Sequence, residues 1–125
     1  MKIDSIAIIE DDEKVRHYMA EQIQLQVDVR ELRVFADGET ALKELTAEPV
    51  EIALFDINLP GMNGIDCIQR LKILHPRMQM MVLTVYDNAD SIFNALKAGA
   101  TSYLLKSTPP DKVIEAILEV KNGGS

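Results

Sequence analysis

The stretch Ile52–Gly64, which reads IALFDINLPGMNG, decides the fold class of this chain. Its first four residues are all apolar, and such an unbroken run is typical of a parallel strand that is buried on both faces. Asp56 ends the run, and the residues after it are dense in Asn, Pro and Gly, which favour turns. The stretch therefore predicts a strand over 52–55 that stops at a carboxylate and turns at once toward a helix.

The same alternation of strand and helix extends from this stretch toward both ends of the chain. Val15, Met19 and Ile23 lie four residues apart on one face of a predicted helix, and Pro110 suits the first turn of the last helix. Predicted strands cover 6–9, 30–35, 52–55, 78–84 and 102–105, and predicted helices cover 13–26, 39–47, 65–74, 90–98 and 110–121. Units of this kind with short connections predict an α/β fold: a doubly wound, five-stranded parallel sheet in the order 2-1-3-4-5, with helices on both faces.

Length and composition are those of one globular domain. The chain has 125 residues, of which 47% are hydrophobic and 26% are charged, a balance that excludes a disordered protein. We expect a domain over residues 1–121 and the start of a flexible linker over residues 122–125, which read NGGS. The net charge of −7 argues against direct nucleic-acid binding by this domain, because phosphate contacts need clustered Lys and Arg.

The sequence also indicates a cellular setting. It contains no apolar run long enough to cross a membrane, and Met1–Ser5 is too short and too polar to open a signal peptide. Cys67 is the single cysteine, which excludes a disulfide framework and a thiol-rich metal site. These features predict a cytoplasmic protein without a membrane partner.

The predicted carboxyl ends of the strands carry side chains suited to phosphoryl chemistry. Glu10 and Asp11 follow the first strand, and Asp56 follows the third. Thr84 ends the fourth strand and Lys106 follows the fifth. Open parallel sheets bind ligands at this edge, where the strand order reverses. Because strands one and three flank that point, we expect the three carboxylates to converge.

Three converging carboxylates repel one another, and a bound cation relieves that repulsion. Oxygen ligands without His or Cys favour a hard ion, and a site with few carboxylates favours Mg2+ over Ca2+. A carboxylate in such a site can attack phosphorus as a nucleophile, while Lys106 and Thr84 bind phosphoryl oxygens. Taken singly, these residues have plainer roles, such as helix capping by Asp11 or Asp12. The chemical interpretation depends on all the strand ends carrying the required residue types together.

At these segments the sequence resembles the response-regulator receiver domain, the phosphoacceptor module of bacterial two-component systems. The resemblance covers Ile6–Val120 and is carried by four segments: Ile8–Asp12 (IIEDD), Leu54–Gly64 (LFDINLPGMNG), Val82–Thr84 (VLT) and Ala98–Lys106 (AGATSYLLK). It implies a flavodoxin-like sheet of the order given above. It also implies phosphoryl transfer from a sensor histidine kinase to an aspartate.

The resemblance assigns a role to each matching residue of the metal site. Asp56 is expected to be the phosphoacceptor, which forms an acyl phosphate. Asp11 is expected to bind Mg2+ directly, with Glu10 acting through water. The backbone carbonyl of Asn58 is expected to complete the metal site.

The resemblance also implies a set of switch residues. Lys106 is expected to bridge a carboxylate and the phosphoryl group. Thr84 is expected to move toward the phosphate, and Tyr103 to turn inward on activation. Phosphorylation would then bias the surface near the fourth predicted helix, the fifth strand and the last helix. The chain would catalyse its own phosphorylation and slow dephosphorylation without being a turnover enzyme.

Some positions near the site depart from the family pattern. Val85 stands where a small residue is common after the threonine, and we expect it to narrow access to the phosphoryl group. Ser107 stands where proline is common after Lys106, and the resemblance implies a cis peptide bond between these two residues. Tyr86 borders the path of the hydrolytic water in the family, together with Asn58, and we expect it to shield the acyl phosphate.

Other residues are given structural roles. His17 and His75 are predicted to face solvent or to cap helices. Ile114 and Leu118 fall on a different face of the last helix from its other apolar residues, which predicts part of a dimer or partner surface. Core packing is predicted for Cys67 and for Met78, Met80 and Met81.

The output of the switch is predicted from the segments Leu104–Thr108 and Glu119–Gly124. They resemble receivers that precede a helix-turn-helix DNA-binding domain, so we expect DNA contact through a C-terminal domain that is missing here, and a homodimer on phosphorylation. A stand-alone receiver that acts on a protein partner is the alternative. A Mg2+-dependent phosphohydrolase would carry a second aspartate at the position of Asn58. A flavin module would need a glycine- and hydroxyl-rich loop where Glu10–Glu13 stands.

Overall fold

The structure is a computed structural model that describes residues 2–123. Within this range, five strands form one sheet in the order β2-β1-β3-β4-β5, and every neighbouring pair is parallel. The elements are β1 (Lys2–Ile9), α1 (Glu13–Gln26), β2 (Asp28–Phe35), α2 (Gly38–Ala47), β3 (Ile52–Phe55), α3 (Gly64–Leu74), β4 (Gln79–Thr84), α4 (Ala89–Ala98), β5 (Ser102–Leu105) and α5 (Pro110–Lys121). The predicted fold class and strand order are confirmed.

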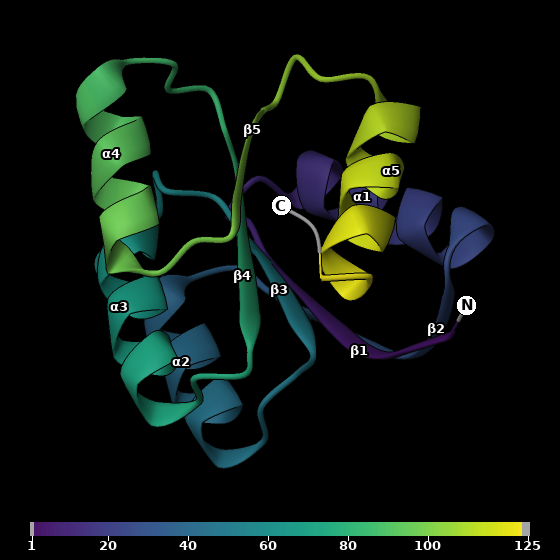
Figure 1. Cartoon of the computed structure of the whole chain (residues 1–125), viewed down its shortest axis with the longest axis horizontal. Coiled ribbons are helices and arrows are strands. Elements are labelled where there is room, and N and C mark those ends of the chain that lie inside the picture. Colours follow the sequence, from purple (N-terminus) through teal and green to yellow (C-terminus); the bar gives the residue numbers. More distant parts are fainter. Residues whose placement is uncertain (1, 124–125) are drawn as a thin grey trace.

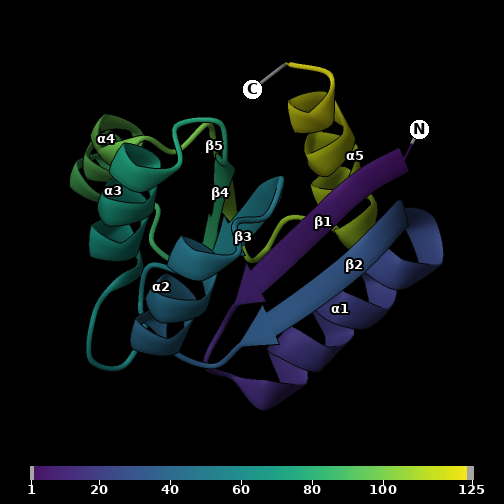
Figure 2. The same cartoon turned by 90° about the horizontal axis from the view of Figure 1, so that it is seen from below.

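Helices cover both faces of the sheet. Helices α1 and α5 lie on one face, and α2, α3 and α4 lie on the other (Figures 1 and 2). Successive residues of β3 alternate between these layers: Leu54 packs in the core on the α1 and α5 side, and Phe55 in the core on the other side. Both faces of the strand are therefore dry, which explains its unbroken apolar sequence.

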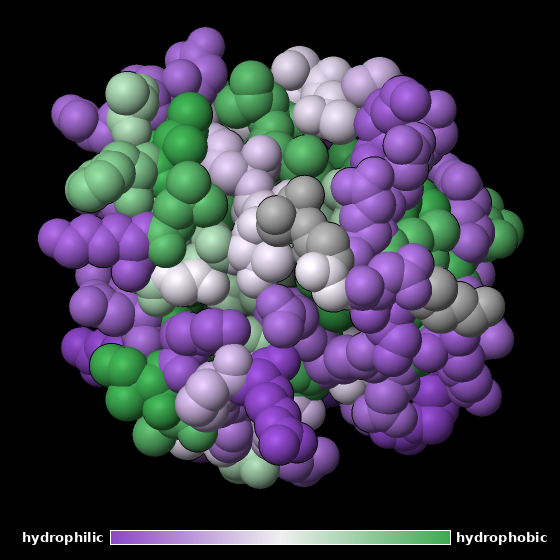
Figure 3. Space-filling model, viewed as in Figure 1, coloured by the Kyte–Doolittle hydropathy of each residue, from purple (hydrophilic) through white to green (hydrophobic). Residues whose placement is uncertain are grey.

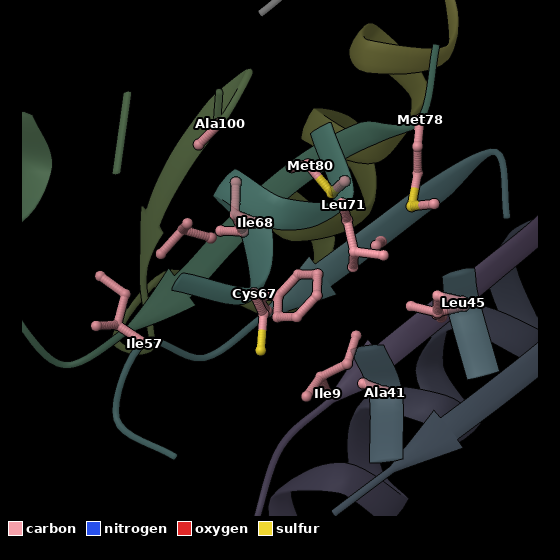
Figure 4. Packing of buried hydrophobic residues seen from close by; sticks show 14 of the residues in the cluster. Ile9, Ala41, Leu45, Ile57, Cys67, Ile68, Leu71, Met78, Met80 and Ala100 are labelled. Carbon is pink, nitrogen blue, oxygen red and sulfur yellow. The ribbon is translucent and has the colours of Figure 1, made fainter. Parts of the chain in front are cut away.

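The core under α2, α3 and α4 contains several of the residues predicted to be buried. Cys67, Ile68 and Leu71 of α3 pack with Ala41 and Leu45 of α2 (Figure 4). Met78 and Met80 complete this core, and Met81 lies in the core on the opposite face. The core roles predicted for the methionines and for Cys67 are confirmed.

The first two strands begin earlier than the apolar runs indicated. Strand β1 starts at Lys2 rather than Ile6, and it pairs in register with β2, which starts at Asp28. Lys2 and Asp4 are exposed while Ile3 and Ser5 are buried, so this part of the strand alternates between solvent and core. The strand prediction was too short because it relied on the continuous apolar run alone.

The predicted partner surface on α5 is wrong for Ile114. Ile114 is buried with Val113 and Ile117 in the core that α5 shares with α1, and the half-buried Leu118 packs against the same core. A helix that packs against both the sheet and a neighbouring helix buries a wider stripe than a helix that packs against the sheet alone. Ile114 is therefore not available to a partner, whereas a partner contact by Leu118 stays a prediction.

The described part of the chain ends in a helix followed by turns. Helix α5 ends at Lys121, and Asn122 and Gly123 form hydrogen-bonded turns behind it. Gly124 and Ser125 of the predicted linker lie outside the described residues, so the linker remains a prediction. Over residues 2–123, no helix has both the length and the apolar character to cross a bilayer.

Candidate functional site

The backbone brings the predicted site residues to one edge of the sheet. The N–H of Asp56 donates to the carbonyl of Ile9 at 3.0 Å, and the N–H of Glu10 donates to the carbonyl of Phe35 at 3.0 Å. On the other side, the N–H of Lys106 donates to the carbonyl of Thr84 at 2.8 Å. These bonds continue the sheet ladders just past the strand ends, so they hold the side chains in register across the edge.

Three carboxylates converge there, as the sequence predicts. Glu10, Asp11 and Asp56 each offer an oxygen, and these oxygens all lie within 4.8 Å of one another. Glu10 and Asp56 are only 4% and 6% exposed, whereas Asp11 is exposed. Burial raises the pKa of Glu10, although hydrogen bonding to Lys106 opposes the rise. The cluster is therefore crowded and acidic, with two buried carboxylates and the exposed carboxylate of Asp11.

Lys106 supplies a positive charge to this cluster. Its Nζ lies 2.5 Å from Glu10 Oε1 and 2.8 Å from Asp56 Oδ2. Burial by itself lowers the pKa of Lys106, but hydrogen bonds to Asp56 and Glu10 outweigh burial, and the net pKa is raised. The ammonium therefore stays charged at neutral pH, and it contacts two carboxylates where the sequence predicted one.

The loop after β3 approaches Asp56 closely. The second oxygen of Asp56, Oδ1, accepts from the N–H of Asn58 at 3.1 Å. The N–H of Gly64, the first residue of α3, donates to the carbonyl of Ile57 at 2.9 Å. A Cβ on Gly64 would lie 2.2 Å from the backbone oxygen of Asp56, so glycine is needed at this contact.

The loop between β1 and α1 divides its carboxylates between two tasks. Asp12 is the N-cap of α1, and its Oδ1 accepts from the N–H groups of Lys14 at 2.9 Å and Val15 at 3.1 Å. The second oxygen of Glu10, Oε2, accepts from the N–H of Asp12 at 3.0 Å. Asp11 forms no side-chain hydrogen bond with the described residues, which leaves its carboxylate available. Capping by Asp12 is confirmed.

Arg16 is a member of the site that the sequence interpretation missed. Its Nη1 donates to the carbonyl of Glu10 at 2.8 Å and lies 3.4 Å from the carbonyl of Asp11. A long cationic side chain one turn into a helix, just after an acidic loop, is the sequence signal that could have pointed to it.

Thr84 ends β4, and Tyr103 lies within the neighbouring strand β5. Thr84 is fully buried, and within residues 2–123 its Oγ1 is the one buried side-chain nitrogen or oxygen without a hydrogen-bond partner. Tyr103 is half-buried, and its hydroxyl donates to the carbonyl of Tyr86 at 2.7 Å. The hydroxyl of Thr84 is thus free to donate to an incoming group.

The predicted cis bond after Lys106 is wrong. Over the part of the chain that the structure describes, no peptide bond is cis, and the Lys106–Ser107 bond is trans. The physical reason is that Ser107 has replaced proline, and the cis form of a non-proline bond costs about 3 kcal/mol.

The two histidines do not take part in the cluster. His17 is exposed on α1. His75 is the C-cap residue of α3, and its Nε2 lies 2.9 Å from the carbonyl of Thr46. Their predicted solvent-facing and capping positions are confirmed.

Comparison with known protein families identifies the family to which this arrangement of residues belongs. A family model described as the response regulator receiver domain matches residues 6–118. The chain belongs to this family. As a receiver domain it is a phosphoacceptor module of two-component signalling, and this assignment decides against the phosphohydrolase and the flavin module.

The relatives of this receiver domain include transcriptional regulators. It is 32% identical over 121 residues to the transcriptional regulatory protein UhpA of Salmonella typhimurium, an alignment that covers 96% of this chain and 60% of UhpA. It is 30% identical over 120 residues to the transcriptional regulatory protein DegU of Brevibacillus brevis, covering 96% of this chain and 51% of DegU. The chain thus spans about half the length of the curated relatives it matches.

Solved structures confirm the fold of the receiver domain. A LuxR-family two-component response regulator from an Aurantimonas species superimposes with a TM-score of 0.91 at 22% identity, covering 98% of this chain and 87% of that one. A CheY-like receiver domain protein from Methanospirillum hungatei has a TM-score of 0.86 at 26% identity, with coverage of 97% and 95%.

Proposed function

We propose that Asp56 accepts the phosphoryl group from a phosphohistidine of a sensor histidine kinase. The observation that carries the proposal is the convergence of the Glu10, Asp11 and Asp56 oxygens within 4.8 Å, beside a lysine that contacts two of them. Phosphoryl transfer needs a nucleophile and positive charge near the phosphoryl oxygens. The buried carboxylate of Asp56 can be the nucleophile, Lys106 supplies an ammonium, and the exposed Asp11 can bind a cation.

The same cluster fits Mg2+, which receiver domains bind in general. Its donors are all oxygens, one of them on the exposed Asp11, which suits a hard ion that keeps several waters. Glu10, Asp11, Asp56 and the backbone carbonyl of Asn58 are the groups we propose to hold it. When bound, the ion supplies positive charge that offsets the repulsion between the carboxylates and the phosphoryl oxygens.

The transfer step uses the chain's own side chains as follows. A carboxylate oxygen of Asp56 attacks phosphorus and forms a P–O bond, while the P–N bond to the donor histidine breaks. The imidazole leaves with the bonding electron pair. The ammonium of Lys106 and the unpartnered hydroxyl of Thr84 take positions against the phosphoryl oxygens and offset their charge. The donor of the group can equally be a small phosphorylated molecule, so the chain promotes its own phosphorylation.

Loss of the phosphoryl group to water is proposed to be slow. Asn58 and Tyr86 line one pocket of about 560 Å3 between the β3–α3 loop and α4, so both can limit how water reaches Asp56. We expect Tyr86→Ala to speed dephosphorylation, measured as the decay of the phosphorylated form after the donor is removed. An unchanged decay rate would exclude the shielding role of Tyr86.

The phosphorylated state is proposed to act on the surface formed by α4, β5 and α5. The hydroxyl of Tyr103 on β5 is tied to the carbonyl of Tyr86, so a shift of Thr84 toward the phosphate can free Tyr103 to turn inward. Figure 3 shows apolar residues gathered over α4, and Phe93 and Leu96 are the exposed ones. A second copy of the chain is the partner we propose for this surface on phosphorylation.

For the whole protein we propose a transcriptional output in the cytoplasm. The two relatives described above are named as transcriptional regulatory proteins and are about twice as long as this chain, which supports a DNA-binding domain after Ser125. The alternative is a stand-alone receiver that acts on a protein partner. The gene sequence beyond Ser125 distinguishes the two.

The test of the phosphoacceptor is labelling with acetyl phosphate, with and without Mg2+. Intact-mass measurement should show one added phosphoryl group on the wild type in Mg2+, and the adduct should be cleaved by alkali. Asp56→Asn should remove the label, whereas Asp90→Asn, which alters an exposed aspartate in the first turn of α4, should retain it. Labelling that persists in Asp56→Asn, or that is unaffected by chelation of Mg2+, would overturn the proposal.

A further inference from the structure

Arg16 holds the backbone of the residues that would bind the metal, and it does so without occupying their carboxylates. It is the fourth residue of α1, and its own N–H donates to the carbonyl of Asp12 at 2.9 Å. Helical side chains lean toward the N-terminus of their helix, and the guanidinium of Arg16 accordingly reaches back over the loop. It meets the carbonyls of Glu10 and Asp11, at 2.8 and 3.4 Å.

The carboxylate of Asp11 depends on this loop for its position. Glu10 is fixed by its backbone bond to Phe35, by Lys106 and by the N–H of Asp12. Asp11, in contrast, is exposed, and its carboxylate has no hydrogen bond or ion pair among residues 2–123. Of the described side chains, Arg16 is the one that donates to its backbone. The orientation of Asp11 is therefore set by a loop whose carbonyls Arg16 ties to α1.

The charge of the loop gives a second reason for a cation at this place. Glu10–Glu13 places four acidic residues in succession, and like charges so close resist compaction. Lys106 neutralises part of this charge but takes oxygens of Glu10 and Asp56 to do so. The half-buried Arg16 uses backbone carbonyls as its hydrogen-bond acceptors, so it takes up no carboxylate oxygen of the loop.

We propose that Arg16 is a positioning residue of the Mg2+ site, which orients Asp11 and Glu10 by clamping their carbonyls. The inference rests on the proposed function of the acidic cluster. Orientation and simple electrostatics predict opposite effects of removing the guanidinium. If Arg16 acts by orientation, its loss weakens Mg2+ binding. If Arg16 acts only as a nearby positive charge, its loss relieves repulsion of the cation and tightens binding.

The experiment measures Mg2+ affinity directly, by isothermal titration of the unphosphorylated protein. Arg16→Met removes the donor and keeps a long side chain with good helix propensity. Lys14→Met is the matched control, because it removes a positive charge from the exposed side of the same helix turn without altering any described side-chain bond to the loop. Arg16→Lys keeps the charge but has a shorter side chain without the planar guanidinium that places Nη1 against both carbonyls. Urea unfolding without Mg2+ is followed in parallel for each variant.

We expect Arg16→Met to bind Mg2+ about tenfold more weakly than wild type, the low end of the range for groups that orient metal ligands. Arg16→Lys should fall between the two, and Lys14→Met should bind as tightly as wild type or slightly more tightly. Affinity in Arg16→Met that equals or exceeds that of wild type overturns the proposal, even if the variant unfolds at lower urea, since Arg16 would then have only a structural role.

The same measurements separate failure of the inference from failure of the proposed metal site. If Arg16→Met does not fold, Arg16→Lys decides in its place, and unchanged affinity in that variant overturns the inference. If the wild type binds no Mg2+, the metal site of the proposed function fails. If the wild type binds but Arg16→Met binds equally well, only the role of Arg16 fails.

Discussion

Replacement of Gly64 by alanine is the sharpest test of how the β3–α3 loop holds the phosphoacceptor. The new Cβ would lie 2.2 Å from the backbone oxygen of Asp56, and 3.0 Å from its carbonyl carbon and from the Cα of Ile57. An ordinary carbon–oxygen contact is about 3.3 Å, so the loop and the end of β3 must separate by about 1 Å. The contacted atoms are all backbone, and no side-chain rotation relieves the overlap.

Two effects of Gly64→Ala oppose each other. Alanine is favoured over glycine in a helix by at most about 1 kcal/mol, which would stabilise the start of α3. Crowding in a packed region costs about 1–3 kcal/mol, and here it falls on a backbone that also supplies the bond from the N–H of Gly64 to the carbonyl of Ile57. We expect a net loss of about 1–2 kcal/mol in the free energy of unfolding, and a fall in Tm of about 4 °C per kcal/mol.

The consequence for chemistry should be larger than the consequence for stability. A displacement of about 1 Å at a reacting group can reduce a reaction rate by ~10²-fold. The labelling of Asp56 by acetyl phosphate should therefore slow by at least roughly tenfold. Urea unfolding and the labelling rate are the two measurements. Gly123→Ala is the control: Gly123 has a φ of +85° but a Cβ there has no neighbour within 4 Å, so it should cost about 1 kcal/mol and leave labelling unchanged.

The reasoning is refuted if Gly64→Ala is as stable as the wild type, or more stable, and takes label at the same rate. That result would mean that the loop yields without moving Asp56 and that helix propensity decides the outcome.

Three further predictions follow from single buried or capping groups. Thr84→Val should raise the free energy of unfolding of the unphosphorylated domain by about 1 kcal/mol in urea titration, because it removes a buried hydroxyl that has no partner in residues 2–123; a loss of stability would reveal a bond to that hydroxyl. Asp37 accepts from the N–H of Thr40 at 2.7 Å as N-cap of α2, and this bond lowers its pKa. Capping is thus present above the unfolded pKa and is lost as pH falls through the lower folded value, so Asp37→Ala should cost about 1 kcal/mol at neutral pH and progressively less below about pH 4. Burial raises the pKa of Cys67 to about 11, so iodoacetamide at about pH 8 should label it only in denaturant, and fast labelling of the native protein would contradict its packing.

The sequence by itself determined the order of the elements and the residues that gather at the strand ends, though not the contribution of Arg16. A buried parallel strand needs apolar residues on both faces, so Ile52–Phe55 was recognisable as a strand without any partner in view. Parallel strands joined by helices must also place their carboxyl ends on one edge of the sheet. For that reason Glu10, Asp11, Asp56, Thr84 and Lys106 could be assigned to one site from their positions at the strand ends alone.

Only the tertiary structure decided which partner each long side chain meets. Lys106 and Arg16 have several rotatable bonds each. Lys106 meets Glu10 and Asp56, which come from distant segments of the chain. Arg16 meets carbonyls of the nearby loop, and this contact depends on how the loop folds back toward α1. The burial of Ile114 was likewise set by packing, because α5 packs against both the sheet and the neighbouring α1, and a helical pattern does not reveal how many neighbours a helix has. Local sequence fixes backbone preference and the direction of an apolar face, whereas contacts between flexible side chains are determined by the folded chain as a whole.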